Sequence, residues 1–477
     1  MYNSLIFELS KKGRIGYSLP NNNLTGFSLS DKLRRKASLD LPEVSELDVI
    51  RHYTNLSLKN FGVDQGFYPL GSCTMKYNPK IDEELSSLEG FTKVHPLQSV
   101  DSLQGSMKVY YELEKKLCAL TGMKAFTFAP CAGAHGELTG LMIIKEYFNQ
   151  LGAPRNKIIV PVSAHGTNPA SAAVAGFEVV VVECVEDGCV DTKKLKELVD
   201  SDTAAIMLTN PSTLGIFEKD ILEISKIMHD NGSLMYYDGA NLNAVLGRLY
   251  TTSMGFDVMH INLHKTFSTP HGGGGPGSGP VGVRSGLEHL LPNPRIVLNN
   301  DKYEFYNSAS SIGRVSSFFG NFSVCLKAYC YILSLGKEHA KDVSSLAVLN
   351  ANYIKESLKD YYKLPISNHC KHEVVFDGLI DKRASTLDVA KRLLDYGYHP
   401  PTIYFPLLFH EALMIEPTEN ESKETLDEFI DVMKKIATED ASILTTAPHN
   451  TIIGRLDDVK AARFPVIKFK DIGKYEW

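Results

Sequence analysis

The sequence predicts an α/β protein with a mainly parallel sheet, followed by a smaller α+β region at the carboxyl end. Two observations support this fold class. Strand-like apolar runs alternate with helical stretches between residues 157 and 262, and helices with short β-like pieces predominate after about residue 335. Short β-rich runs separated by helices are typical of a parallel sheet covered on both faces. Functional residues are therefore expected beyond the carboxyl ends of the strands, where such sheets bind ligands.

Three regions are expected: an amino-terminal arm over residues 1–100, a large α/β domain over 101–334 and a small α+β domain over 335–477. The arm is irregular and rich in turn signals. The large domain begins with two helices, one from residue 103 and one running from residue 135 to about 150, because apolar residues recur there at helical spacing. The expected strands are residues 157–162, 179–182, 204–209, 233–237 and 258–262, and the later helices are residues 192–200, 221–231, 345–359, 386–396 and 425–437.

Composition excludes several classes of protein. With 477 residues, 43% hydrophobic residues, 22% charged residues and a net charge of −6, the chain is neither disordered nor broadly basic, so no nucleic-acid partner is expected. The short basic stretch 32–36 is interpreted as a solvated surface. No apolar run reaches the roughly 18 residues of a membrane-spanning helix, and the first residues lack the pattern of a signal peptide. We therefore expect no membrane association and a cytoplasmic location.

The eight cysteines are scattered, with no paired or zinc-type spacing. They are interpreted as reduced thiols, and no metal site is expected. Cys73 lies in a distinctive Pro-Leu-Gly-Ser-Cys-Thr-Met segment. Redox sensitivity is one interpretation of this residue, and a small packed side chain is the preferred one.

The stretch 258–280 contains the most informative lysine of the chain. Lys265 follows a strand-like run, next to His264 and shortly before a glycine-rich turn, which is where a lysine that forms a Schiff base with pyridoxal phosphate would lie. A surface lysine after a strand is the alternative. The turn formally contains Gly-x-Gly-x-x-Gly, but it leads into another strand-like piece instead of a helix, and no Gly-Lys-Ser/Thr follows. A glycine turn that lets backbone approach a ligand is the better interpretation, with His264 close to the phosphate or the substrate.

Other candidate residues follow neighbouring strands. Asp238 follows residues 233–237 and is of the type that pairs with a protonated pyridine nitrogen, although a capping or turn aspartate is an alternative. His165 follows residues 157–162 and is a candidate to lie over the ring; a structural histidine is its alternative. Asn210 is a candidate donor to the ring's phenolic oxygen, and a plain Asn-Pro turn is its alternative.

A helix that opens with small residues is a candidate phosphate site. Small side chains leave the backbone N–H groups of a helix start free to approach an anion, which the helix dipole also favours. Mere packing is the alternative interpretation. The residues concerned are Ala132, Gly133 and Ala134.

Several long motifs in order closely resemble the glycine cleavage system P-protein, or glycine dehydrogenase (decarboxylating). The similarity extends over nearly the whole chain. The motifs are residues 67–79, 131–137, 164–170, 238–244, 262–267, 270–279, 313–322 and 448–451. This resemblance implies the aspartate-aminotransferase-like fold of pyridoxal phosphate enzymes (fold type I), with Lys265 carrying the cofactor, His165 stacked on its ring and Asp238 at its pyridine nitrogen.

The resemblance also implies partners. The chain matches only the carboxyl-terminal half of the long form of this family, so it resembles the second subunit of a two-subunit form, which implies a lysine-free first subunit and an α2β2 assembly. The implied reaction is decarboxylation of glycine, with transfer of the aminomethyl group to the lipoyl arm of the H-protein. The resemblance leaves the residues that hold the carboxylate of glycine open; His95, His271 and Arg314 are candidates, and a surface or packing role is the alternative for each. Two alternatives remain: another fold-related enzyme, such as an amino-acid decarboxylase or a hydroxymethyltransferase, and a non-catalytic subunit.

Overall fold

The computed structural model describes residues 4–21, 23, 26–37 and 39–472. Two compact units are formed, one from the described parts of residues 1–65 and 448–477 and the other from residues 66–447. No helix in the described ranges is both long and apolar enough to cross a bilayer.

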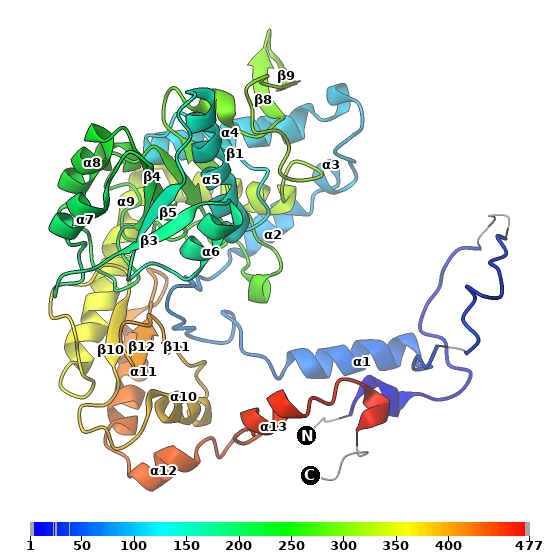
Figure 1. Ribbon diagram of the computed structural model, residues 1–477. Helices are drawn as coiled ribbons and strands as arrows, with labels where there is room; N and C mark the ends of the chain where they lie inside the picture. Colours follow the sequence, from blue (N-terminus) through cyan, green and yellow to red (C-terminus); the bar gives the residue numbers. More distant parts are fainter. Residues whose placement is uncertain (1–3, 22, 24–25, 38, 473–477) are drawn as a thin grey trace. The chain divides into compact units, whose positions relative to one another are not determined.

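A seven-stranded sheet forms the centre of the larger unit (Figure 1). Strands β2 to β6 run parallel to one another, and only β7 among the seven runs against its neighbours, so the predicted mainly parallel sheet is confirmed. In spatial order the strands are β1 (Ala125–Thr127), β7 (Val281–Val283), β6 (Val258–Ile261), β5 (Leu234–Gly239), β4 (Thr203–Thr209), β2 (Lys157–Pro161) and β3 (Glu178–Val182).

Helices cover both faces of this sheet, because successive side chains of its buried strands point to opposite sides. In β5, Met235 and Tyr237 belong to one core cluster, together with residues of α4, α8 and α9. Leu234 and Tyr236 belong to another, together with residues of α5 and α6. The helices are α4 (Gln104–Thr121), α5 (Gly133–Gln150), α6 (Thr167–Val174), α7 (Thr192–Leu198), α8 (Ile221–Asp230) and α9 (Phe322–Leu358).

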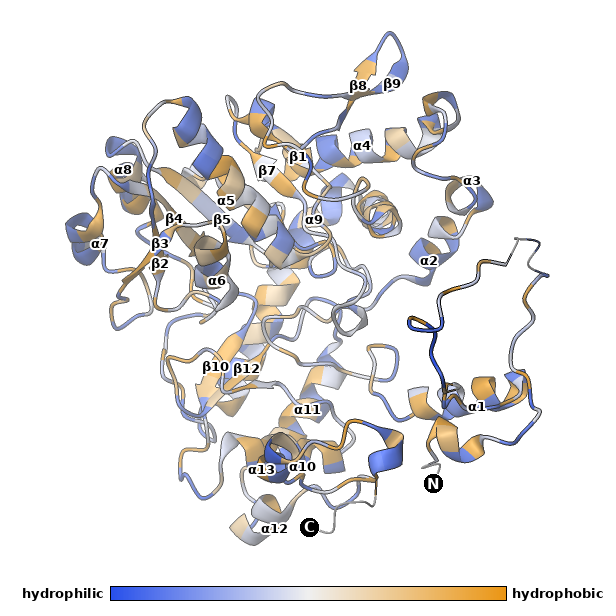
Figure 2. Ribbon diagram, turned by 45° about the vertical axis from the view of Figure 1, so that its right-hand side comes forward, coloured by the Kyte–Doolittle hydropathy of each residue, from blue (hydrophilic) through white to orange (hydrophobic). Residues whose placement is uncertain are grey.

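A second, three-stranded antiparallel sheet packs with helices around its own core, and its two longer strands are strongly apolar (Figure 2). Its strand order is β10-β12-β11. The elements are β10 (Val374–Asp377), β11 (Thr402–Ile403), β12 (Ala412–Ile415), α10 (Thr386–Asp395), α11 (Lys423–Ile436) and α12 (Ala441–Thr446).

Helix α9 joins the large sheet region to this smaller one. It is kinked at Gly336, whose φ of 69° and ψ of 175° are not helical. The predicted boundary between residues 334 and 335 falls beside this kink, and the predicted helix 345–359 is the second half of α9. The division of the chain into three domains remains a prediction.

The segment that precedes the large domain is less irregular than expected. It contains α2 (Lys80–Ser86) and α3 (Glu89–Thr92). Before them, Leu70 forms a β-bridge with Ile415, and Glu416 N–H donates to the carbonyl of Pro69. Residues 66–79 therefore lie against the end of β12, which carries them to the functional site. A hairpin of β8 (Arg295–Asn299) and β9 (Lys302–Tyr306) completes the larger unit.

The smaller unit contains α1 (Glu46–Ser57) and α13 (Asp458–Arg463). Ser45 caps α1 through the N–H of Asp48, whose carboxylate also pairs with Arg14 at 2.7 Å. The chain also has short 3-10 helices at Ile6–Leu9, Val100–Ser102, Thr251–Met254, Gly272–Gly274, Glu288–Leu290 and Phe469–Asp471.

Candidate functional site

A cavity of about 230 Å³ lies at the carboxyl ends of β4, β5 and β6. Its position is the one expected for a ligand site in a parallel sheet. Its lining residues are Ser72, Cys73, Gly133, Ala134, Glu137, His165, Thr167, Thr209, Pro211, Thr213, Asp238, Ala240, Asn241, Asn262, His264, Lys265, His271, His372 and Glu373. Most of the residues singled out from the sequence therefore meet in one place.

Lys265 reaches the cavity from the turn that follows β6. Its Nζ donates a hydrogen bond to the carbonyl oxygen of Ser72 at 2.6 Å. Ser72 belongs to the segment that lies against β12, so a main-chain group from a distant part of the sequence holds the lysine in place.

Asp238 is the last residue but one of β5 and is almost completely buried. Its carboxylate accepts hydrogen bonds from Asn168 Nδ2 at 2.9 Å and from Ala240 N–H at 3.0 Å, and His260 Nε2 lies 3.4 Å from Oδ1. Burial by itself raises the pKa of Asp238, but His260, the two hydrogen bonds and the charge of Lys265 outweigh it, so the pKa lies below its usual value. Asp238 is therefore a buried anion, suited to hold a proton on a ring nitrogen.

His165 lines the cavity and is held by Thr167. The distance from His165 Nδ1 to Thr167 Oγ1 is 2.8 Å, and Thr167 in turn donates to Glu137 Oε1 at 2.7 Å. Burial lowers the pKa of His165 and, with the charge of Lys265, outweighs the nearby charge of Asp238, which raises it. The imidazole is therefore neutral at pH 7, which suits contact with the face of an aromatic ring.

The first turn of α5 supplies backbone donors. Ala132 is its N-cap and no side chain caps it, while Gly133 and Ala134 line the cavity. A Cβ on Gly133 would lie 2.5 Å from Asn262 Oδ1, so only glycine fits beside that asparagine. An uncapped helix start of this kind favours a phosphate group.

Two buried polar atoms at the cavity lack hydrogen-bond partners within the described part of the chain. They are Thr209 Oγ1 and Asn262 Oδ1. Buried polar groups are nearly always bonded, so such orphans indicate a missing polar ligand. Together with Asp238, Lys265 and the start of α5, they fit the ring, aldehyde and phosphate groups of pyridoxal phosphate.

The glycine turn also borders the site. His264 and His271 both line the cavity, with ring centroids 5.5 Å apart, and Ser278 N–H donates to His264 Nδ1 at 3.4 Å. Burial lowers the pKa of His264 to about 3. Gly272, Gly273 and Gly274 have positive φ angles, which supports the interpretation of this run as a turn around a ligand.

Four predicted site residues do not line the cavity, and Ala132, the N-cap of α5, is one of them. The side-chain oxygen of Asn210 accepts a hydrogen bond from the N–H of Glu218 at 2.9 Å, as in a turn residue. Pro211 and Thr213 line the cavity in its place. His95 is exposed and accepts a hydrogen bond from Leu97 N–H. Arg314 is exposed and hydrogen-bonds to a carbonyl three residues away.

Several lining residues had no signal in the sequence. Ser72 and Glu137 lie within the motifs 67–79 and 131–137, and Thr209 ends an expected strand, but nothing in the sequence assigns a role to any of the three. His372 and Glu373 directly precede β10, more than 100 residues beyond Lys265, so only the three-dimensional structure brings them to this site. Cys73 also lines the cavity; burial raises the pKa of its thiol, which favours the inert form.

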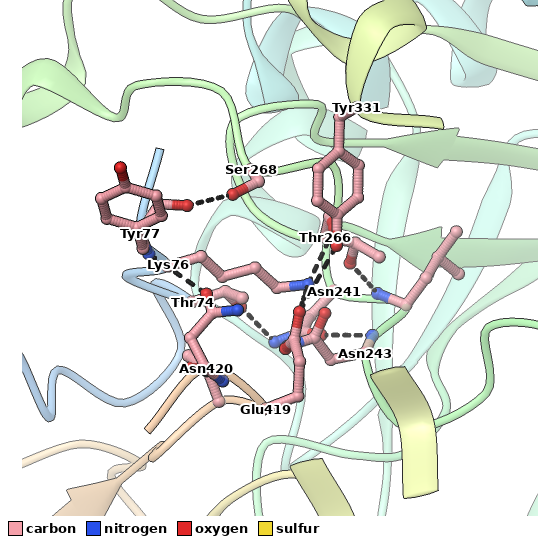
Figure 3. A network of polar contacts seen from close by, with 12 residues as sticks. Thr74, Lys76, Tyr77, Asn241, Asn243, Thr266, Ser268, Tyr331, Glu419 and Asn420 are labelled. Atoms are coloured by element: carbon pink, nitrogen blue, oxygen red, sulfur yellow. Dashed lines mark hydrogen bonds and ion pairs between the residues drawn. The ribbon is translucent and has the colours of Figure 1, made fainter. Parts of the chain in front are cut away.

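A buried network lies next to the cavity (Figure 3). Lys76 Nζ pairs with Glu419 Oε1 at 2.6 Å and donates to the carbonyl of Thr266 at 2.9 Å. Thr266 Oγ1 accepts from Leu242 N–H at 2.8 Å. This network ties Thr266, the residue next to Lys265, to the segment 66–79 through Lys76 and to the turn after β12 through Glu419.

Comparisons with known proteins agree with this geometry. Residues 343–452 match the model of the glycine dehydrogenase C-terminal domain, and residues 136–274 match that of aminotransferase class-V. The chain is 58% identical to the probable glycine dehydrogenase (decarboxylating) subunit 2 of Caldanaerobacter subterraneus subsp. tengcongensis, over 98% of this chain and 99% of that protein. It belongs to the glycine dehydrogenase (decarboxylating) subunit 2 family. The member from Thermotoga maritima is 53% identical over the same shares of the two chains.

Solved structures show the same fold. A crystal structure of glycine decarboxylase (P-protein) in inhibitor-bound form superposes with a TM-score of 0.72 at 18% identity, covering 86% of this chain and 93% of that one. The glutamate decarboxylase of Lactobacillus brevis gives 0.65 at 14% identity, covering 88% and 95%. The chain thus has fold type I, the pyridoxal phosphate-dependent transferase fold predicted from its sequence. The match to the aminotransferase class-V model agrees with pyridoxal phosphate as its cofactor.

Proposed function

We propose that this chain is the cofactor-carrying subunit of a glycine dehydrogenase (decarboxylating), and that Lys265 binds pyridoxal phosphate covalently. The observation that carries this proposal is the convergence of Lys265, Asp238, His165 and the uncapped start of α5 on one cavity. When bound, pyridoxal phosphate supplies an electron sink for the electrons that remain as CO2 leaves.

Each side chain has a distinct task in this proposal. Asp238 keeps a proton on the pyridine nitrogen, because a buried anion stabilises the positive charge there. The N–H groups of Gly133 and Ala134 hold the phosphate, and the neutral His165 lies over the ring. Lys265 Nζ forms and releases the covalent bond to the cofactor's carbonyl carbon.

The substrate side of the cavity has a notable composition. No arginine lines it among the described residues; its charged or titratable groups include His271, His264 and Glu373. Of the three substrate candidates from the sequence, His271 alone lines the cavity, so it is the one retained to contact the carboxylate of glycine. A carboxylate that is not clamped by a strong ion pair is easier to convert to neutral CO2, because ground-state binding of its charge would have to be lost.

Partners follow from the family name. The name subunit 2 implies a subunit 1. We propose that this chain assembles with a lysine-free first subunit into an α2β2 complex. In this complex the aminomethyl group is transferred to the lipoyl arm of the H-protein. Exposed apolar side chains support a partner surface, since large apolar groups on a chain's surface mark contacts with other proteins. Examples are Leu19, Phe27, Leu33 and Ile467, each at least three-quarters exposed. The cytoplasmic location stays a prediction.

Two experiments test this proposal. The purified holoenzyme should show the visible absorption of a lysine-bound cofactor and should lose it in Lys265→Ala, with Lys226→Ala, an exposed lysine of α8, as the matched control. Expressed alone, the chain is expected to self-associate or be poorly soluble, and co-expression with subunit 1 should restore glycine decarboxylation. Full activity of the lone chain would contradict the need for a partner.

Measurements on the same purified protein distinguish this proposal from two alternative functions. Another fold type I enzyme would retain Lys265 and Asp238 but require no lipoyl carrier, so exchange of CO2 with glycine that is independent of lipoyl protein or lipoate would favour it. A non-catalytic subunit would show no cofactor absorption at all.

A further inference from the structure

Two buried glutamates face each other beside the cavity. Glu373 directly precedes β10 and Glu416 directly follows β12, and the antiparallel register pairs Val374 with Ile415, so the two glutamates are opposite one another. They are 3% and 0% exposed. One ring nitrogen of His372 and one carboxylate oxygen each of Glu373 and Glu416 lie within 4.8 Å of one another. Two like charges in this position would be strongly unfavourable.

The hydrogen bonds of the two carboxyl groups differ. Glu416 accepts from Thr74 N–H at 3.1 Å, from Thr74 Oγ1 at 2.7 Å and from Asn241 Nδ2 at 2.8 Å. Glu373 Oε2 accepts a hydrogen bond from the N–H of Ser72 at 2.9 Å, and His372 Nε2 lies 3.5 Å from Glu373 Oε1. Hydrogen bonds to the charged form stabilise it. Glu416 is therefore the better carboxylate and Glu373 the better holder of a proton.

Burial acts in the same direction. It raises the pKa of both carboxyl groups, and the neighbouring Glu416 raises the pKa of Glu373 further, well above its usual value. His372 supplies no balancing charge, because burial lowers its pKa to about 3. Of the other groups facing the pair, Cys73 is a buried thiol and Lys76 is already paired with Glu419. Lys265 is left as the counter-charge, and its positive charge acts on both glutamates.

Ser72 links the lysine to the pair. Its N–H donates to Glu373 Oε2 and its carbonyl accepts from Lys265 Nζ. Ser72 and Thr74 have φ angles of 66° and 47°, a left-handed conformation that is rare for residues other than glycine. Such a conformation persists only when its surroundings enforce it, and here it presents main-chain groups to Lys265, Glu373 and Glu416 together.

We propose that Glu373 and Glu416 share one proton and, with the carbonyl of Ser72, form the resting place of the Lys265 ammonium whenever this lysine is not bonded to the cofactor. They are positioning residues that act through Lys265. The inference rests on the proposed role of Lys265 and adds a site to which that lysine withdraws.

The proton count of the exchange balances on this arrangement. Glycine arrives as an ammonium with three protons on nitrogen and keeps one when its nitrogen bonds to the cofactor's carbonyl carbon. The bond from Lys265 Nζ to that carbon would break, and Nζ, which holds one proton in the protonated form of that bond, would gain the two protons that glycine loses. Lys265 therefore leaves as an ammonium and needs a buried negative partner, which the singly protonated pair supplies.

The test compares Glu373→Gln, Glu416→Gln, the double variant and Asp377→Asn, as holoenzymes in complex with subunit 1. Asp377 is a matched control, since it is a carboxylate at the opposite end of β10 and pairs with Lys363. Infrared difference spectra at neutral pH report the protonated carboxyl group directly, and a glycine titration of the visible absorption reports displacement of Lys265. The ligand-free form of the wild type should show one protonated buried carboxyl group. Both single glutamate variants should lose it, and Asp377→Asn should retain it.

Glycine binding gives the second signature. Each single variant keeps one carboxylate, so the apparent Kd for glycine should stay within about threefold of wild type, whereas the double variant should weaken about 10- to 100-fold, as expected for loss of a nearby opposite charge. Absence of the protonated carboxyl signal in the wild type would overturn the proposal. So would a single variant as impaired as the double one. A Lys265→Ala variant that keeps the cofactor absorption would refute the proposed function instead, and the infrared signal is read independently of it.

Discussion

The ammonium nitrogen of Lys76 lies 2.6 Å from Oε1 of Glu419, and these side chains are only 1% and 7% exposed (Figure 3). The pair joins the segment before the large domain to the turn after β12. Lys76 also bonds to the carbonyl of Thr266, the residue after Lys265. A buried ion pair of this kind is a weak source of net stability, but it leaves an uncompensated charge when one partner is removed.

Lys76→Met alone should therefore lower the free energy of unfolding by about 3–5 kcal/mol, while Lys76→Met combined with Glu419→Leu should cost much less. Guanidinium unfolding followed by circular dichroism measures both. The exposed pair of Lys93 and Glu89 serves as the control, and Lys93→Met should cost at most about 1 kcal/mol. Equal losses in the single and double variants would show that the pairing itself is unimportant.

Asp238→Asn should lower kcat by about 10²- to 10³-fold, the size found when a fixed electrostatic group at a reacting centre is removed. The side chain keeps its shape, so the cofactor should still bind. Asp257→Asn is the control: Asp257 is equally buried, pairs with His229 at 2.9 Å and precedes β6, so it lies at the other end of the strands from the cavity. Steady-state kinetics should separate the two, and a full kcat in Asp238→Asn would exclude its role at the ring nitrogen.

Acid should destabilise the fold through two histidines, the buried His372 and the partly buried His264. Burial lowers the pKa of His264 and of His372 to about 3, whereas in the unfolded chain they titrate near about 6.5. Between these pH values the unfolded chain binds more protons than the folded chain. The contribution of the two histidines to the free energy of unfolding is therefore fully present above about pH 7. It falls as the pH decreases, by up to about 1.4 kcal/mol per pH unit for each histidine. Unfolding measured from pH 7 to 5 should show a smaller slope in His372→Asn; an unchanged slope would contradict the burial argument.

Asp82 is a buried carboxylate whose two oxygens have no hydrogen-bond partner in the described part of the chain. Burial raises its pKa to about 6, and nearby Glu83 adds to this effect. At pH 7 the charge on Asp82 thus lowers the free energy of unfolding. Asp82→Asn should raise the free energy of unfolding by about 1–2 kcal/mol at pH 7. The gain should shrink as the pH falls through about 6 towards the unfolded value near 4, and a gain that does not change with pH would point to packing instead of charge.

The sequence was sufficient to predict the sheet and the edge at which the site lies. Short strand-like apolar runs predict β2 to β6, and parallel strands bring their carboxyl ends together, so Asp238 and Lys265 were expected to be neighbours. The start of α5 was predicted from a different signal, the small residues ahead of a helical pattern.

The rest required the three-dimensional fold. The opposition of Glu373 and Glu416 depends on the register of two strands about 40 residues apart, and the contact of Ser72 with Lys265 spans 193 residues. Neither leaves a periodic signal. Asn210 had the right residue type after a strand, but its side chain completes its own turn. Helix α9 was only half predicted, because Gly336 interrupts its pattern.

The most direct test of the central claim is glycine-dependent exchange of labelled CO2 by the complex of this chain with subunit 1, in the presence of lipoylated H-protein. We expect exchange with the wild-type chain and none with Lys265→Ala, whose cofactor absorption should also be lost. Exchange that persists in pure Lys265→Ala would contradict the assignment of Lys265 as the residue that carries the cofactor.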